Sequence, residues 1–390
     1  MSEQQQRAAW LLLAVAAVIL TLATFYVYFR SQQGMASDRL SYRMVYNADA
    51  GDGLRLMQCS ADGLDCTQLT SGDSTDLLPA AEPPSGASDE PRIAFLRIGE
   101  QGQESGAAGL GMPGGVYILG TRSKELTRVS TGVERVLGVA PSWSPDGTQL
   151  AFGAVEDLNA DGEFAWDESG IYVSDVDGLQ TEHIASGVAG GRKLSWSPSG
   201  DVLLVTGIEA GQPVPFVYAL EVSSGVTITH PTIGQIAAAC WSPDGSQVAV
   251  YSRQDHQVHV LDLQGEEIVA FDGPYGDILE IIWVPGADGD AGQGRLFAVA
   301  GHDYELGAGP LYERSASGAS NQRWRPVAGA QAYTAMLSAS PDGQYVAFTG
   351  FTSEQEGDLF VLERGDAQAR QMTSDPGFEG LATWLVTPLP

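Results

Sequence analysis

Residues 141–154 read PSWSPDGTQLAFGA: an apolar segment, a Ser-Pro-Asp-Gly motif and a second apolar segment. Three more stretches repeat this pattern, namely KLSWSPSGDVLLVTG from Lys193, AACWSPDGSQVAVYS from Ala238 and MLSASPDGQYVAFTG from Met336. Pro presets φ at the first turn position, Asp or Ser hydrogen-bonds the local backbone, and Gly accepts positive φ. Each repeat therefore predicts two strands joined by a tight turn, and the motif itself is structural.

Weaker copies begin at Ala80 and Ile281, and the motif prolines recur at residues 84, 145, 198, 243, 285 and 341. These intervals are close to the roughly 40–50 residues of a four-stranded propeller blade. The first copy lacks the strand that carries Trp, whereas GLATWLVTPL from Gly380 is such a strand without partners. Pairing the C-terminal strand with the strands of the first copy closes a ring and removes sheet edges. We therefore predict an all-β, seven-bladed β-propeller closed by the C-terminal strand, with six or eight blades as alternatives.

The N-terminus predicts a membrane anchor. Ala8 to Phe29 form 22 residues without a charge, enough to cross a bilayer as a helix. A cleaved signal peptide is the alternative, but its apolar core is shorter. The expected organisation is a short tail (1–7), a transmembrane helix (8–29), a linker (30–40) and the propeller (41–390). Arg30, Arg39 and Arg43 follow the helix, so the positive-inside count opposes export, although long domains translocate largely regardless of such charges.

Two cysteines give separate support for export. Cys59 and Cys66 flank Asp62-Gly63, a preferred centre for a two-residue hairpin turn, and the register would place them opposite each other. A disulfide between them would indicate an oxidising compartment. Two reduced core thiols are the alternative. Cys240 lies in an apolar strand and is expected to pack.

One acidic loop matches a calcium-binding pattern. Asp157, Asn159 and Asp161 alternate, Gly162 permits a sharp turn, and the Glu163 carbonyl and the Glu168 carboxylate complete an oxygen-rich ligand set for Ca²⁺. Strands rather than helices are expected on both sides, so the predicted role of calcium is structural. An acidic turn without metal is the alternative.

The chain has a formal charge of −29, which argues against nucleic-acid partners. In a propeller, the loops between the second and third strands of every blade share one face. The seven loops expected there hold 17 Asp or Glu residues and one basic residue, Arg253; they are residues 47–53, 99–109, 155–170, 208–214, 252–257, 301–309 and 351–358. This acidic face favours a cationic protein or peptide partner. A solubilising surface is the alternative.

The Ser-Pro-Asp/Ser-Gly repeats resemble the TolB-like, WD-repeat-like propeller repeats of bacterial envelope proteins, over roughly residues 41–388. The small N-terminal α/β domain of TolB has no counterpart here. The resemblance implies a propeller of the cell envelope, and the predicted anchor makes it a single-pass protein with a periplasmic or surface-exposed propeller. The ring of repeats, and a sequence with no recognisable pairing of a nucleophile with a base, favour binding of a protein or ligand over enzymatic activity. No catalytic residue is predicted. The alternative is a calcium-dependent propeller hydrolase or lyase, with its site at the axis.

Overall fold

The Ser-Pro-Asp/Ser-Gly motif forms the turn that the sequence predicts. In the computed structural model, the Ser144 hydroxyl donates to Asp146 Oδ1 (2.6 Å), and the Gln149 N–H donates to Ser144 Oγ (2.9 Å). Gly147 has φ +69°, a conformation that costs glycine little. The Ser144 hydroxyl and the Thr148 N–H and hydroxyl hold the pKa of Asp146 below its ordinary value. These bonds stabilise the turn between an inner strand and its neighbour.

The structure describes residues 42–84, 90–99, 111–157, 164–165, 168–186, 193–208, 215–228, 235–286, 294–301, 308–317, 322–331, 333–351 and 356–387. Within these residues no helix has the length and apolar character that a membrane crossing requires. The predicted span, residues 8–29, lies outside them. The all-β prediction is confirmed for the described chain.

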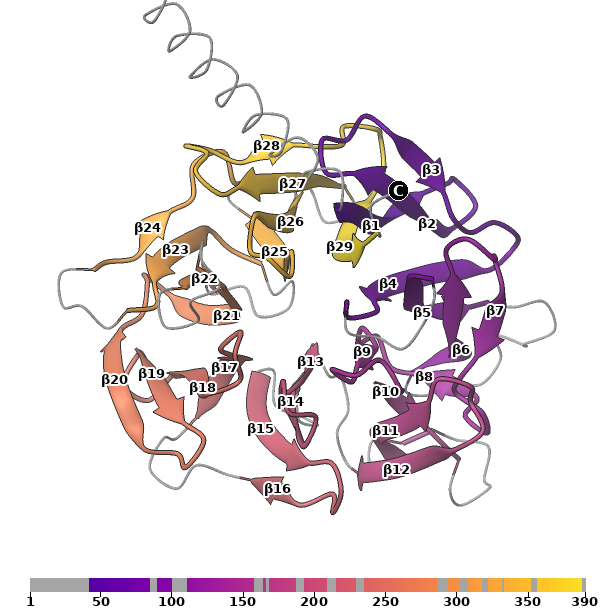
Figure 1. Cartoon of the computed structure of the whole chain (residues 1–390), viewed down its shortest axis with the longest axis horizontal. Coiled ribbons are helices and arrows are strands. Elements are labelled where there is room, and N and C mark those ends of the chain that lie inside the picture. The colour runs from indigo at the N-terminus through magenta and orange to yellow at the C-terminus, as the bar shows by residue number, and fades with distance from the viewer. Residues whose placement is uncertain are drawn as a thin grey trace, which may run out of the picture.

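Five separate four-stranded sheets surround a common axis (Figure 1). The first sheet contains β29 (Glu379–Val386), β1 (Tyr42–Asp49), β2 (Leu54–Ser60) and β3 (Cys66–Gln68). The next contains β13 (Lys193–Trp196), β14 (Val202–Ile208), β15 (Pro215–Glu221) and β16 (Thr227–Ile228). A third contains β17 (Ile236–Trp241), β18 (Gln247–Ser252), β19 (Gln257–Asp262) and β20 (Glu267–Asp272). The fourth contains β21 (Asp277–Val284), β22 (Arg295–Gly301), β23 (Leu311–Ser315) and β24 (Arg325–Pro326). The last contains β25 (Tyr333–Ala339), β26 (Tyr345–Phe351), β27 (Gly357–Glu363) and β28 (Arg370–Gln371).

The remaining sector forms one nine-stranded sheet. Its strands are β4 (Thr75–Ala81), β5 (Arg92–Ile98), β6 (Met112–Gly120), β7 (Leu126–Arg128), β8 (Arg135–Val136), β9 (Ser142–Trp143), β10 (Gln149–Val155), β11 (Ser169–Asp175) and β12 (Thr181–Ser186). The short strand β8 pairs with β6 on one side and with β10 on the other, which fuses two four-stranded arrays. The prediction of seven separate blades is therefore corrected: five four-stranded blades are independent sheets, and residues 75–186 form a single larger one.

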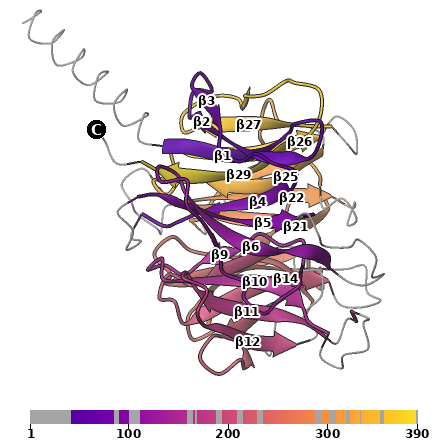
Figure 2. The same ribbon diagram turned by 90° about the vertical axis from the view of Figure 1, so that its right-hand side faces the viewer.

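The C-terminal strand closes the ring as predicted. β29 pairs antiparallel with β1, with Met44 opposite Trp384 and Tyr42 opposite Val386. The other end of β29 places Glu379 opposite Ala48, beside the β1–β2 loop. β1 therefore begins, and β29 ends, on the face opposite that loop. The edge view shows both strands crossing the full thickness of the ring (Figure 2).

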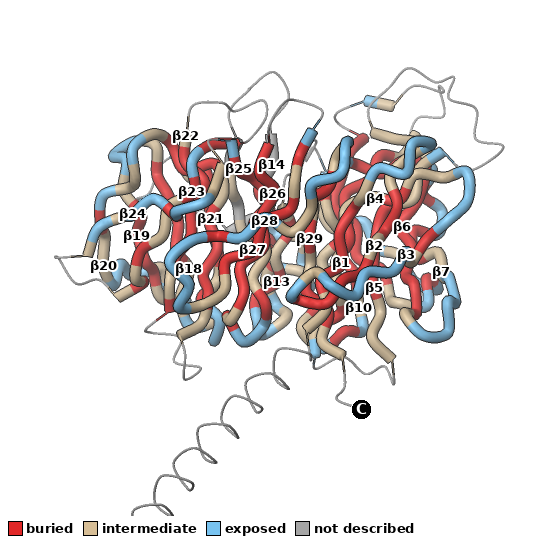
Figure 3. Tube along the Cα trace, turned by 90° about the horizontal axis from the view of Figure 1, so that it is seen from above, coloured by how far each residue is buried: buried red, intermediate tan, exposed pale blue. Residues whose placement is uncertain are grey.

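The core lies between neighbouring blades. One apolar cluster joins Met44 and Trp384 of the first sheet to Ala347 and Leu359 of the last. Buried positions fill the strands, whereas exposed positions concentrate at the turns (Figure 3). Each sheet thus covers the apolar face of its neighbour, and blade-to-blade packing holds the strands that surround the axis.

Candidate functional site: the axis and the acidic face

The axis is lined by the inner strands, whose repeats align at the tryptophan position. Each inner strand contributes one residue three positions before the aligned tryptophan position. In chain order these residues are Leu78, Ala140, Lys193, Ala238, Glu280, Met336 and Leu381. The residues one position before the tryptophan position are Ala80, Ser142, Ser195, Cys240, Ile282, Ser338 and Thr383. All of these positions are described, and only Lys193 and Glu280 carry a charge. Most of the axial strand positions are therefore small or apolar.

Lys193 and Glu280 form an ion pair, with Nζ 3.2 Å from Oε1. Lys193 begins β13 and Glu280 lies in β21, and β17 stands between these two strands in the ring (Figure 1). The ion pair therefore links β13 to β21 across the side of β17 that faces the axis. The side chains are 35% and 19% exposed, so the bridge is partly screened by solvent.

Glu280 also holds the neighbouring blade. Its Oε2 accepts the backbone N–H groups of Met336 (2.9 Å) and Leu337 (3.1 Å) in β25. Met336 has φ +63° at a register shift in β25, which turns both N–H groups toward this carboxylate. One carboxylate thus connects three inner strands around the axis.

A polar network lies where β21 begins. The Tyr251 hydroxyl donates to Asp277 Oδ1 (2.8 Å), and Arg253 Nε lies 3.3 Å from Asp277 Oδ2. His256 Nδ1 lies 3.2 Å from the Tyr251 hydroxyl and 3.4 Å from Asp277 Oδ1. Asp277 is buried, whereas the His256 side chain is 72% exposed. This arrangement can orient an exposed imidazole.

Several carboxylates lie close together on the described part of the acidic face. Glu379 is 7% exposed, and its Oε2 atom makes no hydrogen bond with any described residue. Burial raises the pKa of Glu379, and the nearby Asp375 and Asp358 add to the shift, although a hydrogen bond from Thr373 opposes it. Three carboxyl groups, those of Glu379, Asp358 and Asp375, therefore lie near one another at this end of β29.

Two tyrosines are exposed on the same face. Tyr275 (86% exposed) precedes β21, and Tyr333 (51% exposed) begins β25. Tyr333 pairs with Phe351, the residue that ends β26, so both tyrosines lie at the inner-strand ends next to the acidic loops. An exposed tyrosine offers a rigid apolar ring with a polar end.

The predicted calcium loop is described only at its borders. Glu168 is 6% exposed and accepts the Ala165 N–H at 3.1 Å, and Asp157 is the second residue after β10. Asn159, Asp161 and Glu163 lie outside the described residues. Within the described part of the chain, no group of three or more His, Cys, Asp or Glu side chains is arranged to hold a metal ion. The calcium hypothesis therefore stays a prediction.

Cys59 and Cys66 form a disulfide. Cys59 in β2 is opposite Cys66 in β3, and their Cα atoms are 4.1 Å apart. Cys240 is buried, and burial raises its pKa to about 12, so this thiol is unreactive and packs in the core.

Sequence reasoning missed the Lys193–Glu280 bridge and the network around Asp277. A signal for the bridge exists: aligning the repeats on Trp puts Lys193 and Glu280 at the same position, where other blades have Ala, Leu or Met. The Asp277 network has no comparable signal, because its members come from a strand end, a turn and the next blade.

Comparisons with known proteins agree with this architecture. Residues 28–271 match the family described as the TolB beta propeller domain. The chain belongs to this family. A comparison with curated protein sequences found no match.

Solved structures share the fold of this TolB-type propeller. TolB from Acinetobacter baumannii is 16% identical with a TM-score of 0.52, covering 89% of this chain and 67% of that one. A puromycin hydrolase mutant complexed with PGG is 15% identical (TM-score 0.59, 86% of this chain), and this chain spans 53% of its length. An oligogalacturonate lyase from Vibrio parahaemolyticus is 11% identical (TM-score 0.54; 83% of this chain and 86% of that one). At these identities the likeness establishes the fold alone.

Proposed function

We propose that this TolB-type propeller is a membrane-tethered, extracytoplasmic scaffold that binds a protein or peptide partner on its acidic face and catalyses no reaction. The observation that carries the proposal is the composition of the axis, where the aligned inner-strand positions that the structure describes are small or apolar apart from one ion pair, Lys193–Glu280. An axial active site would need several convergent titratable groups. Counting the nine-stranded sheet as two blades gives seven blades around this axis.

The direction of the strands supports the tether. β1 begins on the face opposite the acidic loops. A bilayer anchor at residues 8–29, joined to β1 by residues 30–41, would hold that face near the membrane and direct the acidic face outward. This orientation also keeps the most acidic loops away from anionic lipid head groups. The Cys59–Cys66 disulfide supports an oxidising, extracytoplasmic location.

The chemistry of the acidic face favours a partner with a basic surface. Carboxylates at Asp358, Asp375 and Glu379 supply the charge, while Tyr275 and Tyr333 supply apolar anchors of a type common in interface centres. Opposite charge raises the association rate and makes binding sensitive to salt.

Photo-crosslinking tests the proposed face. A crosslinkable residue at Tyr275 or Tyr333 of the full chain in its native membrane should capture a basic partner, with a yield that falls as salt rises. The matched control is Leu64, which is 87% exposed at the β2–β3 turn on the opposite face. Capture from position 64 alone, or capture independent of salt, would contradict the proposal.

Calcium belongs to the same proposal as a structural ion held by Asp157, Asn159, Asp161, Glu163 and Glu168. Added calcium should raise the thermal midpoint of unfolding, and Asp157→Ala should abolish that rise, whereas Asp366→Ala, an exposed aspartate elsewhere, should retain it. An unchanged midpoint in the unsubstituted protein ends the calcium hypothesis.

A calcium-dependent hydrolase or lyase is the second proposal, and the network at Asp277 favours it. An exposed imidazole held by a buried carboxylate is a geometry that suits a general base. This function requires calcium-dependent turnover of a peptide or an acidic oligosaccharide that His256→Ala abolishes. The scaffold proposal instead expects His256→Ala to leave partner capture intact and no turnover in either protein.

A further inference from the structure

The Cys59–Cys66 disulfide lies at the outer rim of the ring (Figure 1), beside the β2–β3 turn and on the face opposite the acidic loops. β3 is the outermost strand of the first sheet, and its three residues, Cys66–Gln68, are all exposed. Cys59, in contrast, is 3% exposed and packs in the apolar cluster that joins the first and last blades. The disulfide therefore has one half exposed to solvent and the other half buried.

The buried sulfur has a hydrogen-bond donor beside it. The Tyr46 hydroxyl lies 3.5 Å from Cys59 Sγ, and it is the donor in this contact because a disulfide sulfur carries no proton. Burial and the nearby carboxyls of Glu379 and Asp375 raise the pKa of Tyr46, so the hydroxyl keeps its proton.

The two sulfurs therefore differ in how well they would carry negative charge. Cys66 Sγ lies 3.5 Å from the Gly63 carbonyl oxygen, which has no proton to donate. Burial by itself disfavours a thiolate at Cys59. The Tyr46 hydroxyl offsets that cost, because a hydrogen bond to a charged acceptor is stronger than one to a neutral acceptor.

Access also distinguishes the two halves of the disulfide. In thiol–disulfide exchange a thiolate attacks one sulfur from the side opposite the sulfur that leaves, so the reaction depends on access to that side. For attack at Cys66 the approach comes from beyond β3, where the sheet has no further strand. For attack at Cys59 it comes from the side of β1, where Met44 is opposite Cys59 and Tyr46 packs in the same cluster. Only Cys66 is open to attack in the folded protein.

We propose that Cys66 is an S-thiolation site for a low-molecular-weight thiol. The thiolate of that molecule attacks Cys66 Sγ, a new S–S bond forms between the two sulfurs, and the Cys59–Cys66 bond breaks. The electron pair of the broken bond stays on Cys59 Sγ, which accepts the Tyr46 hydrogen bond and then takes a proton from solvent. The products are a mixed disulfide at Cys66 and a thiol at Cys59, and the attacking thiol is the only other reactant.

The modification acts on a turn that takes part in closing the ring. Arg370 of β28 donates to the Asp62 carbonyl from Nη1 (2.9 Å) and to the Ala61 carbonyl from Nη2 (3.2 Å), so the last blade holds the β2–β3 turn of the first. Because β3 contributes no buried side chain, the disulfide is its main link to the core. Thiolation at Cys66 therefore loosens β3 and this contact between the two blades. The site does not depend on the partner proposed for the acidic face, which lies on the other side of the ring.

Brief exposure of the full chain, folded in detergent, to glutathione tests the proposal. After an acid quench, alkylation of free thiols in denaturant and fragment-ion mass spectrometry should find glutathione on Cys66 and the alkyl group on Cys59. Cys240 is the internal control, because it is buried and should resist alkylation when the reagent is added before the denaturant.

Hydrogen exchange measures the effect of the modification on the turn. The Ser60 N–H donates to the Asp65 carbonyl at 3.1 Å, across the β2–β3 hairpin and beside the disulfide. This amide should exchange faster by on the order of thirtyfold in the thiolated protein, which corresponds to the stabilisation that a typical disulfide provides.

Two tyrosine variants separate the hydrogen bond from the packing. Tyr46→Phe should slow formation of the mixed disulfide by about threefold, because it removes one hydrogen bond from a sulfur that carries part of the negative charge in the transition state. Tyr345→Phe removes a hydroxyl from another buried tyrosine of the same apolar cluster and should leave the rate unchanged.

Three results would overturn the proposal. One is glutathione on Cys59, or equally on both cysteines. Another is a reaction that occurs only when Cys240 also becomes labelled, since exchange would then follow unfolding. The last is a rate in Tyr46→Phe that is no lower than the rate in Tyr345→Phe. If Tyr46→Phe does not fold, the position of glutathione in the unsubstituted protein decides the test.

Discussion

At the scale of single residues, the tryptophans connect the blades through their indole N–H groups. Four of them donate to a backbone carbonyl on the inner strand of the preceding blade: Trp143 to Ala80 (2.9 Å), Trp196 to Ser142 (2.9 Å), Trp241 to Ser195 (3.1 Å) and Trp384 to Ser338 (3.2 Å). Trp283 differs, because its buried Nε1 has no partner among the described residues. Each of these tryptophans except Trp283 therefore both packs between two blades and forms a hydrogen bond to the preceding blade.

Trp384→Phe and Trp283→Phe separate the hydrogen bond from the packing. Both replacements lose a similar apolar area, but only Trp384→Phe removes a formed hydrogen bond and leaves the Ser338 carbonyl unpaired. We expect Trp384→Phe to lower the free energy of unfolding by about 1–2 kcal/mol more than Trp283→Phe does. Urea denaturation of both variants measures the difference, and equal destabilisation would exclude a contribution from the indole bonds.

The raised pKa of Glu379 predicts how the stability of the folded protein depends on pH. Because burial raises the pKa of this carboxyl in the folded state, its contribution to stability is complete below the ordinary pKa of glutamate and is lost as pH rises through the raised value. Glu379→Gln should therefore raise the thermal midpoint at pH 7, with a gain that shrinks toward pH 4. The control Glu125→Gln, at an exposed position, should change neither value. A gain independent of pH would show that charge is not the cause.

Sequence reasoning works well at this scale for local features and poorly for tertiary ones. The turn built by Ser144, Asp146 and Gly147 depends on neighbours in the chain, so its bonds could be predicted. The acceptor of each indole N–H comes from another blade, and the burial of Glu379 depends on β1 and on the residues that precede β29. No pattern within a single repeat reports such contacts.

At the scale of strands, the inner strands contain irregularities that the repeat pattern does not show. Leu78, Met336 and Leu381 occupy the same repeat position and all have positive φ, at register shifts in β4, β25 and β29. A non-glycine residue pays a cost in this conformation. In β25 the shift presents two N–H groups to Glu280, which stabilises the irregular strand.

Glu280 should therefore matter more than the lysine that pairs with it. Glu280→Ala leaves the N–H groups of Met336 and Leu337 without their acceptor, at an expected cost of about 1–3 kcal/mol in the free energy of unfolding. Lys193→Met removes only a partly exposed ion pair, at about 0–1 kcal/mol. Glu280→Gln, which keeps an acceptor, should fall between them. Calorimetry that finds Lys193→Met as costly as Glu280→Ala would mean that the ion pair, not the backbone contact, holds these strands.

The short strand β8 explains why the separate-blade prediction is wrong between residues 75 and 186. Val136 pairs with Met112 of β6 on one edge and with Ala154 of β10 on the other. Arg135 Nη2 donates to the Gly111 carbonyl at 2.7 Å and holds the segment in place. Two residues form this link, and a segment that short has no periodicity from which to predict a strand.

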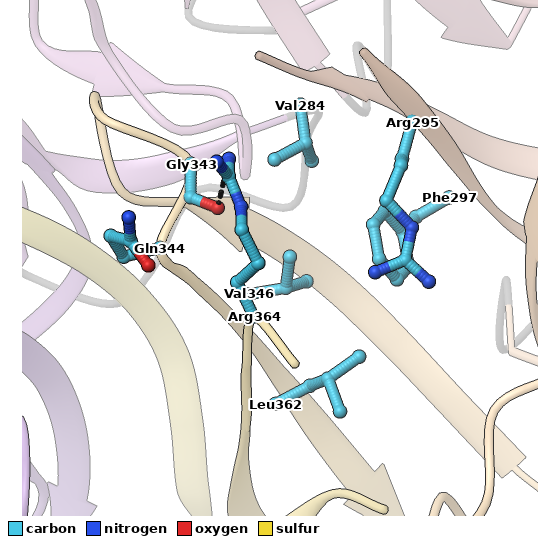
Figure 4. A pocket seen from close by; sticks show the side chains of 8 residues that line it. All are labelled: Val284, Arg295, Phe297, Gly343, Gln344, Val346, Leu362 and Arg364. Atoms are coloured by element: carbon cyan, nitrogen blue, oxygen red, sulfur yellow. Dashed lines mark hydrogen bonds between the residues drawn. The ribbon is translucent and has the colours of Figure 1, made fainter. Parts of the chain in front are cut away.

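At the scale of the whole molecule, the two faces of the ring have different chemistry. One face holds Glu379, Asp358 and the exposed Tyr275, whereas the other holds the Ser-Pro-Asp/Ser-Gly turns and a small pocket between Arg295 and Arg364 (Figure 4). Which loops share a face could be predicted, because strand order alone decides which loops lie at the same end of the ring. The arginine pocket could not, because it forms where two blades meet.

The central claim is that β29 and β1, at opposite ends of the chain, form one sheet and close the ring. Replacing Tyr42 and Val386 by cysteine tests it, because these residues are opposite each other in the antiparallel pair. Mild oxidation should join them almost completely and raise the thermal midpoint, since the crosslink stabilises by on the order of 4 kcal/mol when it closes a loop this long.

A matched pair at Tyr42 and Tyr275 should not crosslink, because Tyr275 precedes β21 in a different blade and on the other face. If the 42–386 pair remains reduced under conditions that preserve the Cys59–Cys66 disulfide, or crosslinks no faster than the 42–275 pair, the two strands are not neighbours. The closed ring would then be wrong.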